Sequence, residues 1–159
     1  MPTKPRQQDP GPQRPISITA VVDCVGALAS RSMHGHLYLY DTNKAAGSTG
    51  LGTEELKTWV KRGDRLLWNA LALECEAFVS IDGIAIDKEV CEPEEKVYPG
   101  TDVTYWIGTV KKDTAEAIPY RLSFRLGTRA EPITTTRSPA LVGRIAGQAR
   151  TAQQPQEES

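Results

Sequence analysis

The sequence predicts an all-β protein, a single antiparallel β-sandwich of jelly-roll-like form. Apolar and polar residues alternate with a period of two along most of the middle of the chain, which is the pattern of strands with one buried face. Turn-forming Gly, Asp and Pro residues separate these stretches at intervals of roughly 8 to 12 residues, which is typical of sandwiches and barrels. No stretch keeps a helical period of 3.6 residues.

The expected strands follow one another between residues 16 and 142. The clearest runs from Ile118 to Leu126, with an apolar face turned inward and Arg and Ser residues turned outward. The segment from Arg65 to Leu73 is apolar on both faces, so we place it in the centre of a sheet. Asp82-Gly83 has the sequence of a type I′ turn and predicts a hairpin between two strands. The remaining expected strands are 16–23, 35–41, 55–61, 77–81, 84–90, 102–110 and 133–142.

Two terminal segments lack the residues that form a core. Residues 1–15 hold five of the eleven prolines, and residues 144–159 are polar and rich in Gln. Such segments bury too little apolar surface to offset the entropy lost on ordering. We therefore expect a β-sandwich domain over residues 16–143, between two disordered tails.

Charge and composition exclude several classes of function. The 159 residues carry 19 Lys plus Arg and 20 Asp plus Glu, a net charge of −1, whereas nucleic-acid binding needs a basic surplus. No apolar stretch approaches the roughly 20 residues that cross a bilayer, and the N-terminus has no apolar signal segment. Three widely spaced cysteines without a CxxC motif predict free thiols. We expect a cytoplasmic protein that binds neither nucleic acid nor membranes.

The stretch from Leu37 to Trp68 carries a family resemblance. It reads LYLYDTNKAAGSTGLGTEELKTWVKRGDRLLW, with Asp-x-Asn after a strand, a Gly-rich loop, Gly-Thr-x-Glu-Leu, and Gly-Asp before a strand with Trp. With Val-Val-Asp at 21–23 and Ser-Pro-Ala-Leu at 138–141, it resembles the AidA/PixA inclusion-body protein family. The resemblance implies a compact bacterial β-sandwich, abundant in cytoplasmic inclusions, with no established catalytic residues. Some members look like sugar-binding lectins.

Polar residues beside the Gly-rich loop form the first part of a candidate ligand site. Asp41 and Asn43 follow a strand, where side chains of this kind hold a loop through hydrogen bonds to its backbone. The alternative is that Asp41, Asn43 and the loop form a polar cup for a sugar hydroxyl or a cation.

Aromatic rings form the second part of this site. Tyr38, Tyr40, Trp59 and Trp106 lie opposite the aliphatic residues of their strands, so we place them on the outward face; a single bulge would reverse such an assignment. An outward ring stacks on a sugar or anchors a protein interface, unless loops or a neighbouring sheet cover it. Trp68 lies in the strand that is apolar on both faces, so we assign it to the core.

His34-Gly35-His36 suggests an alternative, enzymatic function. Two histidines at i and i+2 followed by Asp41 resemble the first metal motif of cupins, which would suit Fe(II), Mn(II) or Ni(II). However, the chain has only these two histidines, the usual cupin carboxylate is Glu, and His36 and Asp41 would face opposite ways on one strand. We therefore favour two surface histidines, and we expect no metal and no cofactor.

These observations together predict a non-catalytic protein, not an enzyme. We expect it to act by self-assembly, as a homo-oligomer, or by ligand binding. A carbohydrate is the first choice of ligand, held by Asp41, Asn43 and an outward ring of Trp59 or Trp106.

Overall fold

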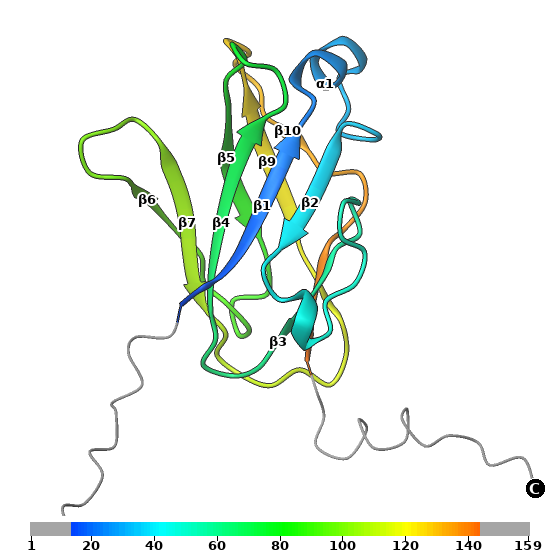
Figure 1. Cartoon of the computed structure of the whole chain (residues 1–159), viewed down its shortest axis with the longest axis vertical. Helices are drawn as coiled ribbons and strands as arrows, with labels where there is room; N and C mark the ends of the chain where they lie inside the picture. Colours follow the sequence, from blue (N-terminus) through cyan, green and yellow to red (C-terminus); the bar gives the residue numbers. More distant parts are fainter. Residues whose placement is uncertain (1–13, 144–159) are drawn as a thin grey trace, which may run out of the picture.

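The computed structural model describes residues 14–143 (Figure 1). The two expected tails, 1–15 and 144–159, lie outside the described residues except for Arg14 and Pro15, so the division into tails and domain stays a prediction. The all-β prediction is confirmed: strands in two packed layers make up the fold. Within the described residues no helix is long and apolar enough to cross a membrane.

The front layer in Figure 1 is a five-stranded sheet in the order β2-β1-β4-β7-β6. Its neighbouring strands run antiparallel except for β1 and β4, which run parallel. Alternation of apolar and polar residues carries no information on strand direction, so the sequence could not distinguish this mixed sheet from an antiparallel one. The strands are β1 (Ile16–Val22), β2 (Leu37–Asp41), β4 (Arg65–Ala72), β6 (Glu94–Val97) and β7 (Thr104–Thr109).

The back layer consists of two three-stranded sheets, in the orders β10-β9-β5 and β3-β11-β8. Tyr120 is the single residue between β8 and β9, so the chain passes directly from one of these sheets to the other. Strands β3 and β11 run parallel, and the other pairs in this layer are antiparallel. The strands are β3 (Lys57–Val60), β5 (Val79–Ala85), β8 (Ile118–Pro119), β9 (Arg121–Leu126), β10 (Ile133–Thr134) and β11 (Ala140–Gly143).

The core between the layers is centred on Trp68 and Tyr120. Trp68, in the middle of the front sheet, is fully buried, as the sequence predicts. Its ring meets that of Tyr120 edge to face, with centroids 5.9 Å apart, and its Nε1–H donates to the Tyr120 hydroxyl at 3.4 Å. The inward residues of the predicted strand 118–126 join this core. They include Leu122, Phe124 and Leu126.

A short helix that the sequence analysis did not predict connects β1 to β2. Helix α1 (Cys24–Ser30) begins after Asp23, whose carboxylate accepts the Gly26 N–H at 2.9 Å. Glu74 accepts the N–H groups of Cys24 and Val25, so two carboxylates satisfy the free donors of the first turn. Seven residues are too few to show a helical period of 3.6 residues. The residue in the sequence that could have indicated this helix was Asp23, because Asp is a favoured N-cap. A 3-10 turn, η1 (Lys44–Ala46), follows β2.

The predicted hairpin at Asp82-Gly83 is wrong. Strand β5 runs straight through these residues, and its register with β9 shifts by one between Ile81 and Gly83, which leaves Asp82 as a bulge. The Asp82 carboxylate meets the Arg125 guanidinium at 2.9 Å. Because of the bulge, Ile81 and Ile84 both lie opposite core residues of β9, although three positions separate them.

The acidic run after Cys91 forms a strand, which the sequence analysis also did not predict. Strand β6 is exposed at every position and pairs with β7 at the edge of the front sheet. Charged side chains on an edge strand hinder its pairing with another chain. The charged sequence of β6 therefore resembles that of a solvated loop, which is what the sequence predicted.

We predict that Trp68→Ala lowers the free energy of unfolding by about 3–5 kcal/mol, because it leaves a cavity beside Tyr120. Trp59→Ala should cost much less, because Trp59 is only half-buried. Urea titrations of both variants, followed by circular dichroism, test this, and equal losses would contradict the assignment of Trp68 to the core.

Candidate functional site

Asp41 and Asn43 use their polar groups to hold the loop after β2. Asp41 Oδ1 accepts the Asn43 N–H at 2.9 Å, and the Asn43 amide donates to the Trp59 carbonyl. Asp41 Oδ2 is buried, with no protein partner among the described residues. The structure thus shows the loop-holding role that the sequence analysis favoured for both residues.

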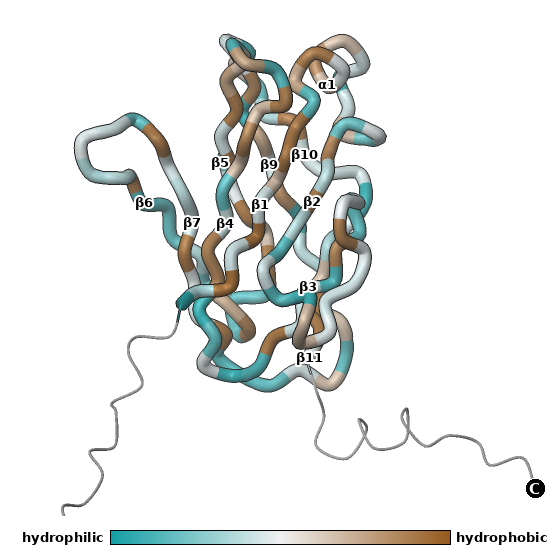
Figure 2. The backbone as a smooth tube through the Cα atoms, in the orientation of Figure 1, coloured by the Kyte–Doolittle hydropathy of each residue, from teal (hydrophilic) through white to brown (hydrophobic). Residues whose placement is uncertain are grey.

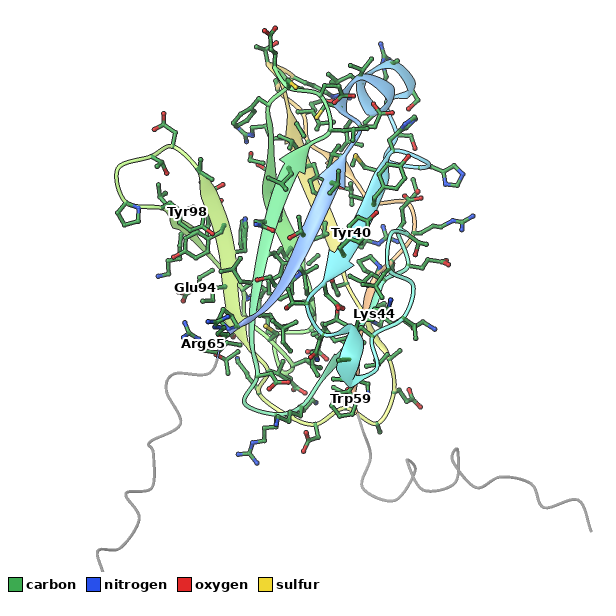
Figure 3. The ribbon with its side chains drawn as sticks, viewed as in Figure 1. Tyr40, Lys44, Trp59, Arg65, Glu94 and Tyr98 are labelled. Carbon is green, nitrogen blue, oxygen red and sulfur yellow. The ribbon has the colours of Figure 1, made fainter. Side chains whose placement is uncertain are left out.

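Trp59 lies next to this loop, as Figure 3 shows with Lys44 above it. Its ring is half-exposed and packs against Gly47, where a Cβ atom would lie 3.3 Å from the indole. The backbone at Gly47 has φ of 128°, which other residues rarely adopt. An open depression of about 380 Å³ lies beside the ring, lined by Arg14, Ile16, Asn43, Ala46, Trp59, Lys61 and Asp64.

Trp106 does not face outward, which corrects its expected orientation. It packs against the core, and its Nε1–H donates to the Ile81 carbonyl at 3.0 Å, so it joins the two layers. Its neighbour Val103, which we expected inside, is exposed. The sequence analysis had assigned the wrong face of the strand 102–110 to the core. The structure therefore places Trp106 away from Asp41, Asn43 and Trp59, which share one loop region.

The two histidines lie in the turn before β2 and contact different carboxylates. His34 Nδ1 is 3.6 Å from buried Glu54, and His36 Nδ1 is 3.2 Å from Asp23. Over residues 14–143, no cluster of three or more His, Cys, Asp or Glu residues could hold a metal ion. The geometry gives the cupin-like alternative no support.

The three cysteines are all free thiols. Cys24 and Cys91 are buried, and burial raises the pKa of each thiol to about 11. Cys75 is exposed in the turn between β4 and β5. Neither buried thiol has the lowered pKa of a nucleophile.

The outward face of the front sheet carries a single charged side chain, Arg65, on its strands β1, β2 and β4. We call it the tyrosine face. Strand pairing sets Val21 between Tyr38 and Leu71 in one row across β2, β1 and β4, and Thr19 between Tyr40 and Asn69 in the next. Tyr38 is 37%, Tyr40 46% and Leu71 55% exposed. The tyrosine face consists of Ser17, Thr19, Val21, Tyr38, Tyr40, Leu67, Asn69, Leu71, Tyr105 and Ile107.

The outward face of the back layer is different, although it belongs to the same sandwich. Arg121 and Arg125 are exposed there, and Arg125 pairs with Asp82. Ser123 and Thr134 share a hydrogen bond between their hydroxyl groups at 2.9 Å. Solvent-facing sheets ordinarily carry such polar residues, so the tyrosine face is the exception.

Strands β7 and β4 separate at one edge of the tyrosine face (Figures 1 and 2), and an apolar groove lies there. The sequence analysis did not find it, because it depends on where two strands part and not on a motif. We call it the fork groove, with a volume of about 340 Å³. It is lined by Ala70, Leu71, Ala72, Ala77, Phe78, Val79, Ser80, Asp102, Val103 and Thr104.

Comparisons with known proteins match both the sequence and the fold. A family model described as a domain of unknown function (DUF8788) matches residues 14–131. The structure is similar to the crystal structure of the inclusion body protein PixA from Burkholderia cenocepacia, with a TM-score of 0.64 and 14% sequence identity. The match covers 84% of this chain and 99% of that chain, which confirms the expected AidA/PixA-like fold. No curated protein matches.

We predict that iodoacetamide at neutral pH modifies the native protein at Cys75 alone, because the other two thiols are buried and protonated. Mass spectrometry of the intact protein should show one added group, and Cys75→Ser should remove it. Rapid modification of Cys24 or Cys91 without denaturant would contradict the structure.

We also predict an acid-dependent loss of stability through Asp23. Its pKa is held below the usual 3.8, chiefly because its carboxylate accepts the Gly26 N–H, and His36 adds to the effect. A lowered pKa in the folded state stabilises the protein above pH 3.8, and this contribution is lost as the pH falls through the folded value.

Asp23→Asn is the matched variant for this prediction, because Asn also caps helices but does not titrate. Urea titrations between pH 2 and 6 (about the range in which carboxyl groups titrate) should show a steeper decline for the wild type below pH 3.8. Parallel curves would show that Asp23 contributes nothing.

Proposed function

The chain belongs to the DUF8788 family, and we propose that it is a non-catalytic protein that associates with copies of itself through the tyrosine face. The observation that carries this proposal is that the outward positions of β1, β2 and β4 are uncharged apart from Arg65 at the start of β4. In a monomer these positions would face water, where charged and polar residues are the rule.

The geometry of the face fits a second copy of the same sheet. Sheets pack face to face about 10 Å apart, with side chains of both interdigitated. A two-fold axis through the face would bring Tyr38, Tyr40 and Leu71 of one copy against the same patch of the other. The name of the structurally similar PixA, an inclusion body protein, fits a role in assembly.

The size of the face predicts weak association. Its four strands, spaced about 4.8 Å apart and about six residues long, cover roughly 400 Å². Each partner in a stable complex buries roughly 800 Å², so this face alone would hold two copies together only at high concentration. Such weak contact suits a protein that is present at high concentration.

The remaining chemistry supports a role without catalysis. The buried thiols have raised pKa values, the histidines contact separate carboxylates, and Asp41 and Asn43 hold a loop. Three free cysteines are compatible with the reducing cytoplasm, where we expect the protein to act.

A carbohydrate is the second candidate ligand, in the depression beside Trp59. A half-exposed indole next to the side chains of Asn43, Lys61 and Asp64 offers a stacking surface and polar partners for hydroxyl groups. Binding on a glycan array that Trp59→Ala removes would support it. The absence of binding at high protein concentration would contradict carbohydrate binding, and self-association would then be the one proposed function that is left.

We predict that static light scattering of the full chain shows a mass that rises with protein concentration. Tyr38→Lys with Tyr40→Lys should reduce this rise, because two charges would have to be desolvated in the interface. Thr134→Lys puts one such charge on an exposed position of the back layer and should leave the rise unchanged. A constant monomer mass, or equal effects of all variants, would contradict the proposal.

A further inference from the structure

A buried carboxylate beside the outer edge of β2 has an oxygen without a protein partner. Glu54 is only 8% exposed, and its Oε2 accepts the Gly35 N–H at 3.3 Å. Its Oε1 is buried and has no hydrogen-bond partner among the described residues. Buried carboxylates are ordinarily paired with cations or hydrogen-bond donors, because their removal from water is costly. The contact with Gly35 explains the burial of Oε2 and leaves that of Oε1 unexplained.

The position of Glu54 follows from the loop that covers the edge of the front sheet. Strand β2 is the outermost strand of this sheet. The Gly52 N–H donates to the Leu39 carbonyl at 2.7 Å, and the Leu39 N–H donates to the Thr53 carbonyl at 3.3 Å. Gly52 has φ of 81°, a backbone conformation that favours glycine. This pairing holds the next residue of the loop, Glu54, beside β2.

An open depression of about 280 Å³ lies at this carboxylate, and we call it the Glu54 depression. Tyr38, Glu55 and Arg137 line it together with Glu54. Its volume is slightly below the roughly 300–1,000 Å³ of sites for drug-sized molecules, so a small ligand fits. The two carboxylates and the one guanidinium leave one negative charge in the lining, which favours a cation.

The cationic side chains nearby do not pair with Oε1. Arg137 Nη1 lies 4.0 Å from Glu55 Oε1, and His34 Nδ1 lies 3.6 Å from the other oxygen of Glu54, Oε2. The side chain of Arg137 is 54% exposed and that of His34 is 61% exposed. Exposed pairs at such distances contribute little to stability. Oε1 of Glu54 therefore remains available to a donor on a ligand.

The single available oxygen indicates the kind of cation. A guanidinium group binds a carboxylate through two parallel hydrogen bonds, which need both oxygens, and Oε2 already accepts from Gly35. An ammonium group is a compact charge, for which one oxygen is enough. The ring of Tyr38 lines the same depression, and an aromatic ring attracts an ammonium group and packs against an alkyl stem.

We propose that the Glu54 depression binds a primary ammonium group on a short alkyl stem, carried by a small amine or by a lysine side chain. The ammonium group donates to Glu54 Oε1, and its stem lies along Tyr38. Glu55 adds a second, exposed negative charge, and Arg137 competes with the ligand as a cation.

A titration of the full chain with butylammonium chloride tests this binding. It is followed in ¹⁵N spectra at about pH 7.5, where alkylamines are protonated and most histidines are not. Because the Gly35 amide donates to Glu54, its signal should shift and reach saturation. Butanol, which has the same stem without the charge, and sodium chloride should give no saturable shift. The absence of saturation with butylammonium, or equal saturation with butanol, would overturn the proposal.

Three variants locate the ammonium group. Glu54→Gln keeps the size of the side chain and an acceptor for the Gly35 N–H. It should weaken binding about 10- to 100-fold, as expected for the loss of one charged hydrogen bond. Glu55→Gln makes the same change at a side chain that is 60% exposed. It should weaken binding only about two- to fivefold, and Arg137→Gln should strengthen it by a similar factor.

Equal effects of Glu54→Gln and Glu55→Gln would contradict the proposal, because they would show that binding does not depend on the buried carboxylate. Unchanged affinity in Arg137→Gln would also contradict it, and this result is obtained even if Glu54→Gln fails to fold.

A lysine derivative distinguishes the two sources of the ammonium group. Nα-acetyl-lysine methylamide carries the same charge and stem on a peptide backbone. Tighter binding of this compound than of butylammonium would assign the site to a lysine side chain, and equal or weaker binding would assign it to a small amine.

The proposed binding does not depend on the proposed self-association, because Leu71 of the tyrosine face does not line the Glu54 depression. Leu71→Lys should therefore reduce the rise in scattering and leave the affinity for butylammonium unchanged.

Discussion

The burial of Trp68 against Tyr120 fixes the register on which the rest of the structure depends. Trp68 is fully buried in the third of five strands, opposite Ile18 of β1 and Trp106 of β7. A slip of one residue would exchange the two faces of β4 and put Leu67 or Asn69 in place of the indole. Because neighbouring strands share that register, the same pairing decides which residues of β1 and β2 face outward.

Two surfaces follow from this register. The inward residues fill the core, and the alternate residues form a face with Tyr38, Tyr40 and Leu71, on which Arg65 is the one charged residue of β1, β2 and β4. The pairing of β4 with β7 ends at Trp68, where the fork groove begins. These two surfaces are the reason why we propose that the protein acts through contact with other molecules. Its fold is that of the inclusion body protein PixA, although only 14% of residues are identical.

Much of this fold could be predicted from the sequence, because alternation of apolar and polar residues marks strands with one buried face. It identified Trp68 as a core residue, the inward residues of β9, and Tyr38 and Tyr40 as outward. It failed where local signals compete with long-range pairing. Asp82-Gly83 has the composition of a turn, but pairing with β9 keeps β5 extended and accommodates Asp82 as a bulge.

The candidate site shows the same division. Alternation assigns two faces to a strand but not which one is buried, and for Trp106 the ring itself was the core residue. Asn43 and Trp59 lie in one region, where the Asn43 amide donates to the Trp59 carbonyl, and ligand binding by Asp41, Asn43 and Trp59 stays a prediction. The fork groove is made by three segments that come together only in the folded chain, so no local pattern in the sequence marks it.

The most direct test of the central claim is a dilution series followed by nuclear magnetic resonance on the full chain. The account predicts that signals of Tyr38, Tyr40 and Leu71 shift with protein concentration, while those of Ser123 and Thr134 on the back layer stay constant. Signals independent of concentration, or shifts confined to the back layer, would contradict the role that we give to the outward side of the five-stranded sheet.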